Sequence, residues 1–229
     1  MNNPEFSAEF DILYNNIMSN AAPGLDEYEK SKFLTDAQEN YVKELYNGAP
    51  TFEGDEEVRR YLGNLLRTFE TSEKLIGQTG ISRKSVFFEL PDDVMFITYE
   101  SVTLNDSSLG CLNGNEAVVV PVTQDTYYKC NRNPFRGPTE NRVLRLDNSS
   151  YAVELISDYN IGRYFCKYLK RPRPIILTDL TTIGDNITIE GQTEESECEL
   201  HPATHRPILE RAVMLAKLAW SSGAGQQGK

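Results

Sequence analysis

Residues that build disulfide frameworks and metal sites are scarce in this sequence. Its 229 residues include only four cysteines, two histidines and one tryptophan. No C-x-x-C pair occurs among the cysteines, which indicates reduced thiols and not a disulfide framework: Cys111, Cys130, Cys166 and Cys198. No apolar run approaches the roughly 18 residues of a membrane span, and the N-terminus lacks a signal-peptide pattern. We expect a soluble protein, made in the cytoplasm, with no membrane partner.

Positive charge is also in short supply. The formal net charge is −11, from 23 Lys and Arg against 34 Asp and Glu. Because phosphate contacts need cations, this balance excludes a protein that wraps duplex DNA for affinity. An acidic surface could instead let DNA move past without binding, and the charge is equally compatible with solubility alone.

Sequence motifs of catalysis are missing as well. The chain has neither the G-x-S-x-G nucleophile elbow nor the G-x-x-x-x-G-K phosphate loop, and Gly110-x-x-x-Gly114 lacks the lysine. The acidic cluster in residues 194–199 is too dense for a pair of catalytic carboxylates and is typical of a solvated loop. These motifs therefore point to no catalytic site and no cofactor, and nothing in the sequence selects a Ser–His or Cys–His pair.

One spacing does look like a metal site. Cys198-x-x-His201-x-x-x-His205 contains both histidines of the chain. Zinc takes about four ligands, and the fourth is missing unless the fold brings in Cys166 or a glutamate. The other interpretation places both histidines at a helix entrance, with Thr204 as the cap and no metal. We favour this second interpretation and keep a metal-dependent accessory protein or enzyme as an alternative function.

Helical patterns fill the first 80 residues. A first helix opens at Asn3-Pro4 and is broken over residues 20–24. A second begins with a capping box, Asp26-x-x-Glu29, and runs to Tyr46 as one helix or as two that meet at Leu34. A third follows Asp55 and continues to Phe69 at helical spacing.

From Ser85 onward apolar residues recur at every second position, so residues 85–190 are predicted to be β-rich. Strands over 85–90 and 95–104 are predicted to pair as a hairpin, as are strands over 142–146 and 151–156. A strand over 117–123 contains Pro121, which favours a sheet edge or a bulge. Residues 125–138 are predicted to form an ordered turn. Short β segments are expected at 175–177 and 186–190.

The clearest amphipathic helix is predicted for residues 204–220. Apolar residues recur there at i, i+3, i+4 and i+7 from Ile208 to Trp220. The N-terminal helices, a mostly antiparallel sheet or barrel-like region and this helix predict one α+β domain over residues 1–220. The tail, residues 221–229, is predicted to be disordered.

Two segments of opposite charge lie between the predicted sheet and the last helix. The basic segment is stiffened by prolines and contains Lys167, Lys170, Arg171 and Arg173; the acidic loop contains Glu195 and Glu197. We expect these to be subunit contacts, in which the protruding basic patch of one copy docks on an acidic surface of its neighbour. The alternatives are a nucleic-acid contact helped by Tyr164, Phe165 and Tyr168, and a solvated strand end.

Three blocks of sequence are more specific than these patterns. The first is F-D-x-L-Y-N-N-I at residues 10–17, followed by A-P-G-L-D-x-Y-E-K-S-x-F-L-T-x-A-Q at residues 22–38. The second is N-P-F-R at residues 133–136. The third is R-P-R-P-I-I-L at residues 171–177, continued by C-E-L at 198–200 and by residues 205–217. Together these blocks resemble a structural protein of tailed phages, in particular of crAss-like phages.

The resemblance implies a virion protein without enzyme activity. It implies a ring at the portal–tail junction, either a head-to-tail adaptor or a tail-barrel ring, through which the genome passes without specific binding. The implied partners are other copies of the chain, often twelve in all, the portal protein and other neck and tail rings. The implied location is the neck or tail of a virion whose proteins are made in the host bacterial cytoplasm. Another capsid- or tail-associated structural protein is the remaining alternative.

Overall fold

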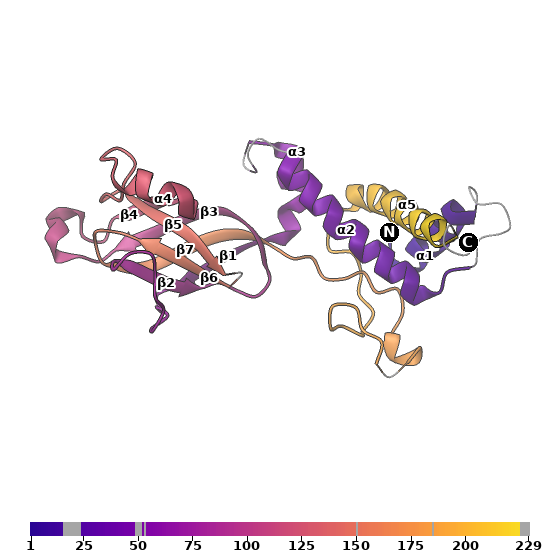
Figure 1. Ribbon diagram of the computed structural model, residues 1–229. Helices are drawn as coiled ribbons and strands as arrows, with labels where there is room; N and C mark the ends of the chain where they lie inside the picture. The colour runs from indigo at the N-terminus through magenta and orange to yellow at the C-terminus, as the bar shows by residue number, and fades with distance from the viewer. Residues whose placement is uncertain (16–23, 49–51, 53, 150, 185, 225–229) are drawn as a thin grey trace. The chain divides into compact units, whose positions relative to one another are not determined.

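The computed structural model describes residues 1–15, 24–48, 52, 54–149, 151–184 and 186–224, and it shows a mixed α+β protein (Figure 1). The chain forms two compact units. Met1–Leu65 and Arg171–Lys229 make a helical unit, and Leu66–Lys170 makes a sheet unit. The chain therefore leaves the helical unit after Leu65, completes the whole sheet, and returns at Arg171.

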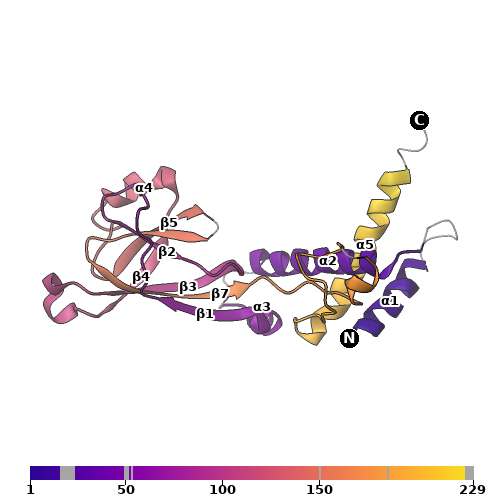
Figure 2. The same ribbon diagram turned by 90° about the horizontal axis from the view of Figure 1, so that it is seen from below.

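Three long helices build the helical unit: α1 (Asn3–Asn15), α2 (Glu27–Gly48) and α5 (His205–Ala224). The C-terminal helix α5 packs against both α1 and α2 (Figure 2). Fully buried apolar side chains from all three meet in its core, among them Phe6, Phe10, Leu34, Ile208 and Leu209. The shorter elements are α3 (Glu56–Leu62) and the 3₁₀ turns Gly63–Leu65, Leu180–Thr182 and Pro202–Thr204.

Capping explains where the first two helices begin. The α2 capping box is confirmed, since Asp26 Oδ1 accepts from the Glu29 N–H at 2.7 Å and Glu29 returns a bond to the Asp26 N–H. The cap of α1 is Asn2, one residue before the predicted position, and it exchanges the same pair of bonds with Glu5. α2 is a single helix with no interruption at Leu34. The predicted break at residues 20–23 lies outside the described residues.

The predicted third helix is too long. Asp55 caps it as expected, but α3 ends at Leu62, and Leu66–Thr71 forms strand β1. This strand pairs antiparallel with β7 (Ile161–Lys170), with Phe69 opposite Cys166. Pairing with β7 gives the backbone N–H and C=O groups of Leu66–Thr71 hydrogen-bond partners. This long-range pairing outweighs the local helical preference that the spacing of Leu65 and Phe69 indicates.

The sheet unit contains seven strands in the order β1-β7-β3-β4-β5-β6-β2. Its other strands are β2 (Ser85–Glu89), β3 (Val94–Leu104), β4 (Glu116–Pro121), β5 (Arg142–Ser149) and β6 (Ala152–Ile156). Every neighbouring pair is antiparallel except β4 and β5, which are parallel, so the mostly antiparallel sheet is confirmed. The sheet is curled (Figure 1), and a 3₁₀ element, Ser107–Leu112, joins β3 to β4.

Alternating side chains give the sheet an apolar layer on each face. One layer includes Phe88, Val143, Leu155 and Tyr164. On the opposite face, Tyr127 of α4 (Gln124–Asn131) packs on three residues that follow the same alternation: Leu144, Leu146 and Ile156. This helix was missed, because residues 125–138 were predicted to be a turn throughout.

Strand pairing confirms one predicted hairpin and corrects the other. β5 and β6 pair as expected, whereas β2 pairs with β6 at the sheet edge and β3 lies between β7 and β4. Pro121 is the last residue of an interior strand, so the predicted edge or bulge is wrong. Its missing N–H does not break the ladder, because the next donor, the Val122 N–H, reaches the Arg145 carbonyl at 2.8 Å.

A buried ionic network crosses the sheet. The carboxylate of Glu100 accepts hydrogen bonds from the Arg145 guanidinium and the Tyr164 hydroxyl. The side chains of Glu100 and Arg145 are 5% and 12% exposed. Burial raises the pKa of Glu100 against the opposing effect of Arg145, and burial also raises the pKa of Tyr164.

The C-terminal helix was predicted over residues 204–220, and the helix continues to Ala224. Residues 221–224 of the predicted disordered tail are therefore helical, and residues 225–229 lie outside the described ranges. No helix in the part of the chain that the structure describes is long and apolar enough to cross a membrane.

Candidate subunit-contact site

The four cations of the predicted basic patch divide between the two units. Lys167 and Lys170 are half-buried residues of β7, in the sheet unit. Arg171 and Arg173 are exposed and belong to the helical unit. The basic segment is thus a strand end followed by the first residues of a different unit.

Both arginines have carboxylate partners within the same chain. Arg171 Nε lies 3.3 Å from Glu39 Oε1 of α2, and Arg173 Nε donates to Glu199 Oε1. Glu199 belongs to the acidic loop, so one pair of the charges that we expected to meet between copies meets inside a single copy. The Arg173 side chain remains 62% exposed, although that of Glu199 is only 11% exposed, so water screens the arginine end of the pair.

The segment that follows the patch, residues 173–177, is a buried strap on α2. The Ile175 N–H donates to Thr35 Oγ1 at 3.1 Å, and the Leu177 N–H donates to Ser31 Oγ at 3.0 Å. Ser31 and Thr35 are at most 2% exposed. A buried N–H needs a hydrogen-bond acceptor. These hydroxyl oxygens are the acceptors that the carbonyls of a neighbouring strand would be in a sheet.

Gln38 extends this polar stripe by one helical turn. Its Nε2 donates to the carbonyl of Arg173 at 2.7 Å, and its Oε1 accepts from the thiol of Cys198 at 3.1 Å. Burial raises the pKa of Cys198 to about 11, so the thiol stays protonated and is able to donate. Gln38 therefore joins the strap to the end of the acidic loop.

The strap corrects the expectation of a protruding segment. Pro172 and Pro174 are buried, as are Ile175, Ile176 and Leu177. The expected β segment at 175–177 is reduced to one bridge between Ile176 and Ser196. Three apolar residues in a row indicate burial from the sequence alone. The spacing of Ser31, Thr35 and Gln38 on α2 was not recognised as a row of hydrogen-bond partners for this strap.

The acidic loop is anchored at its middle and exposed on either side. Glu195 Oε1 accepts from Asn3 Nδ2 at 2.9 Å, and the same amide donates to the Ile176 carbonyl at 3.0 Å. Asn3 is 1% exposed, so it anchors the loop and the strap to the start of α1. Glu194 and Glu197 are exposed and face solvent. These two carboxylates are therefore accessible to a cation of another molecule.

The nucleic-acid alternative needed three accessible aromatic rings on β7. Tyr164 is fully buried and Tyr168 is 6% exposed, with its hydroxyl bonded to Asp93 at 3.0 Å. Phe165 is half-buried on the opposite side of the strand. Two of the three rings are therefore core residues on which no base can stack.

The two histidines have separate structural roles at the start of α5. His201 Nδ1 accepts from the Ala203 N–H at 3.2 Å, so His201 caps the turn that leads into the helix. Thr204 was expected to be the cap, but its hydroxyl donates to the His201 carbonyl instead. His205 is 6% exposed and packs on the ring of Phe6.

His205 is held as a neutral ring. With a proton on Nε2 it donates to the Leu200 carbonyl at 3.2 Å, and its Nδ1 accepts from the Met1 amino group at 2.7 Å. Burial lowers the pKa of His205, and the positive Met1 amino group lowers it further. Among the described residues, no group of three or more His, Cys, Asp or Glu side chains is placed to hold a metal ion.

Comparison with known proteins gives consistent matches along the whole chain. The model of the family described as phage tail ring protein 3/4 matches residues 1–228. Ring protein 3 of Bacteroides phage crAss001 is 51% identical over 232 residues, which cover 99% of this chain and 100% of that protein. Ring protein 4/5 of the same phage is 37% identical over 232 residues, covering 96% of this chain and 94% of that protein.

Proposed function

Because this chain belongs to the phage tail ring protein 3/4 family, it is a structural ring protein of a phage, and we propose that it forms a homo-oligomeric ring at the portal–tail junction. The ring is a neck adaptor or a tail-barrel ring that links head to tail and lets the genome pass. The observation that carries this proposal is the family match over residues 1–228. Membership of a structural family favours this role over catalysis.

Ring formation requires two different surfaces on each copy. A head-to-tail contact between unlike surfaces closes into a ring when its rotation divides a full turn, and we propose that it closes with twelve copies. Its outer faces then meet the portal protein and other ring proteins of the neck or tail. The exposed cations and carboxylates of the chain are suited to specify such neighbours.

The distribution of charge supports passage of the genome without binding. The helical unit carries 21 acidic and 11 basic residues, whereas the sheet unit carries 13 acidic and 12 basic residues. Nearly all of the excess negative charge therefore belongs to the helical unit. A lumen lined by this unit repels the phosphate backbone, and no counterions are released by contact.

Reconstitution with neck components tests the proposed position. The purified chain is mixed with the portal protein of the same phage and, separately, with its other tail ring proteins, and the mixtures are separated by size. We expect a complex that contains the chain and the portal or an adjacent ring, and no shift of duplex DNA at physiological salt. A chain that joins neither partner, or that holds duplex DNA tightly, would contradict the proposal.

A further inference from the structure

An exposed basic and aromatic tip stands on the sheet unit, at the end of α4 and in the turn that follows it. Its aromatic residues are Phe135, 86% exposed, and Tyr128, 58% exposed. Its cations are all exposed: Lys129, Arg132 and Arg136. Large apolar side chains at such exposure are typical of contact sites when charged residues surround them. We call these five residues the basic tip.

The turn that carries Phe135 is fixed by its own hydrogen bonds. The Phe135 N–H donates to Asn133 Oδ1 at 2.9 Å, and the Gly137 N–H donates to the Asn133 carbonyl at 2.8 Å. Arg142 donates to the Phe135 carbonyl from the adjacent strand. A Cβ at Gly137 would lie 3.2 Å from the Asn133 carbonyl oxygen, so the turn is tight where Gly137 is placed. Because the backbone that carries the ring is already ordered, binding costs only the freedom of the Phe135 side chain.

The tip is cationic in an acidic protein. Residues 124–142 contain four Lys and Arg but only two acidic residues, Asp125 and Glu140. In the ranges that the structure describes, neither Arg132 nor Arg136 has a carboxylate within ion-pair distance. Two exposed guanidinium groups beside an exposed phenyl ring fit an acidic surface that has apolar side chains at its base.

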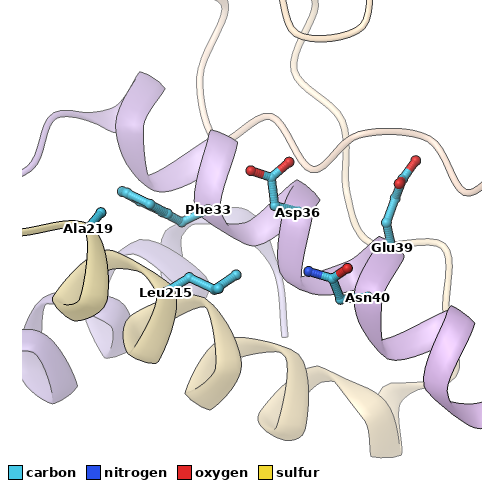
Figure 3. Close-up of a pocket in the computed structure, with 6 residues that line it drawn as sticks. All are labelled: Phe33, Asp36, Glu39, Asn40, Leu215 and Ala219. Carbon is cyan, nitrogen blue, oxygen red and sulfur yellow. The ribbon is translucent and has the colours of Figure 1, made fainter. Parts of the chain in front are cut away.

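The helical unit has a surface of this kind, which we call the acidic groove (Figure 3). The groove lies between α2 and α5 and has a volume of about 440 Å³. Its apolar side chains are Phe33, Leu215 and Ala219, and its polar side chains are Asp36, Glu39 and Asn40. Its size is within the roughly 300–1,000 Å³ of sites that hold a bulky group.

The two carboxylates of the groove already have cation partners within the chain. Asp36 Oδ1 lies 3.2 Å from Lys32 Nζ, while Glu39, whose side chain is 18% exposed, lies 2.8 Å from Lys43 Nζ and 3.3 Å from Arg171 Nε. The side chains of both lysines are about half exposed, at 50% and 47%. The exposed Asp36–Lys32 pair is worth about 1 kcal/mol or less, so an incoming guanidinium competes with it at small cost, whereas at Glu39 it competes with Arg171 as well.

We propose that the basic tip of one copy binds in the acidic groove of the next copy around the ring. Phe135 covers the apolar side chains Phe33 and Leu215, while Arg132 and Arg136 pair with Asp36 and Glu39. The inference rests on the proposed ring, and it names the two unlike surfaces that the ring requires. Because tip and groove are on different parts of the chain, the contact is heterologous and repeats from copy to copy.

Charge complementarity within one sequence favours a second copy over nucleic acid as the occupant. A strand of DNA or RNA would need a track of cations and stacked rings along several nucleotides, whereas the tip offers two exposed rings, Phe135 and Tyr128, and three cations at one place. The helical unit offers acidic residues in excess together with apolar side chains at the base of the groove. A single base stacked on Phe135 would contribute about 1–3 kcal/mol, so binding of single-stranded DNA is measured as the competing outcome.

Three variants of the full-length chain test the contact by self-association, measured by sedimentation over a range of concentrations. F135A and R132E/R136E alter the tip, and D36K/E39K alters the groove. Each is expected to weaken association at least tenfold, because central aromatic and arginine anchors dominate interfaces. The combined variant R132E/R136E/D36K/E39K is expected to recover association, since the charges are exchanged and again complementary.

Matched controls separate the contact from general effects of charge and exposure. I76A removes another exposed apolar side chain of the sheet unit, 97% exposed, and R83E with E89K exchanges exposed charges elsewhere in that unit. These controls are expected to associate as the parent chain does. Circular dichroism and thermal unfolding of every variant show whether it is folded, and F135A alone decides the question if a charge variant does not fold.

The outcomes distinguish this contact from the ring itself. If the parent chain forms rings and the tip and groove variants form them equally well, the proposed contact is wrong and the ring stands. If the parent chain does not assemble at all, the proposed function fails first. If labelled single-stranded DNA binds the parent chain and F135A and R132E/R136E abolish that binding while association is unchanged, the tip is a nucleic-acid site and the contact is overturned.

Discussion

The backbone N–H of Ile175 donates a hydrogen bond to the hydroxyl of Thr35 at 3.1 Å, across 140 residues of sequence. Between these two positions the chain builds the entire sheet unit. Both residues are buried, so the bond satisfies a donor that has no strand beside it. The helical unit is thus closed by a strap that arrives only after the sheet is complete.

Removal of the Thr35 hydroxyl tests how much the strap contributes. Thr35→Val keeps the shape of the side chain but leaves the Ile175 N–H without its acceptor. We expect the free energy of unfolding in urea to fall by about 1–3 kcal/mol, the cost of a buried unpaired donor. Thr68→Val, at an exposed position of β1, is the matched control and is expected to change it by less than about 0.5 kcal/mol. Equal values for the two variants would show that the strap is not held in this way.

The ionic network of the sheet unit gives a second prediction. Glu100→Gln removes the charge that compensates Arg145 in a site where both are largely buried. We expect a loss of roughly 3 kcal/mol in the free energy of unfolding, since the remaining carboxylate, Asp147 at 3.2 Å from Arg145 Nε, is 72% exposed and compensates the buried guanidinium only in part. Glu116→Gln, exposed on β4, is the control. A loss no larger than that of the control would mean that Arg145 finds water or another acceptor.

His205 makes the stability of the helical unit depend on pH. Its folded pKa lies below the usual 6.5, so between the two values the unfolded chain binds more protons than the folded chain. Stability is therefore fully present above about pH 6.5 and is lost as the pH falls toward the folded pKa. Thermal unfolding between pH 5 and pH 8 should show this loss, and His205→Gln should reduce it.

The partner variant for that experiment is His201→Gln, which changes the other histidine of the same turn. It is expected to keep the pH dependence of the parent chain, because His201 caps a turn through Nδ1 at the surface of the unit. If both variants lose the pH dependence equally, or neither does, protonation of the buried ring is not its cause.

The predicted contact between the basic segment and the acidic loop stays a prediction, and charge reversal tests it. Arg171→Glu with Arg173→Glu should weaken assembly of the ring and make it more sensitive to salt. Because Arg173 also pairs with Glu199 inside the chain, the unfolding temperature of the monomeric variant must be measured beside its assembly. Glu197→Lys tests the acidic side, since Glu197 is exposed. Rings that assemble as before in both variants would remove this contact.

Residues close in sequence predicted the helices and strands of this fold better than they predicted which strands pair. The capping box at Asp26 and Glu29 and the hairpin of β5 and β6 were readable because each depends on residues close in sequence. β1 was read as helix because Leu65 and Phe69 have helical spacing, and only β7, about one hundred residues later, supplies its backbone partners. The pairing of β2 with β6 rather than with β3 is also a long-range choice that no local turn signal encodes.

In the candidate site, too, the sequence predicted local features but not the contacts between distant segments. The basic segment and the acidic loop were identified from the sequence as complementary in charge, but the sequence could not show that Arg173 and Glu199 meet inside one copy. The polar stripe of Ser31, Thr35 and Gln38 looked like the outer face of a helix until the strap covered it. The exposed ring of Phe135 was part of a recognised sequence block, and its exposure became visible only in the fold.

The most direct test of the account is electron microscopy of the purified full-length chain, alone, at concentrations that favour assembly. The account predicts closed rings whose class averages show one rotational symmetry, with each subunit in contact with two neighbours through unlike surfaces. A chain that remains monomeric under these conditions and in the presence of the portal and the other ring proteins would contradict it.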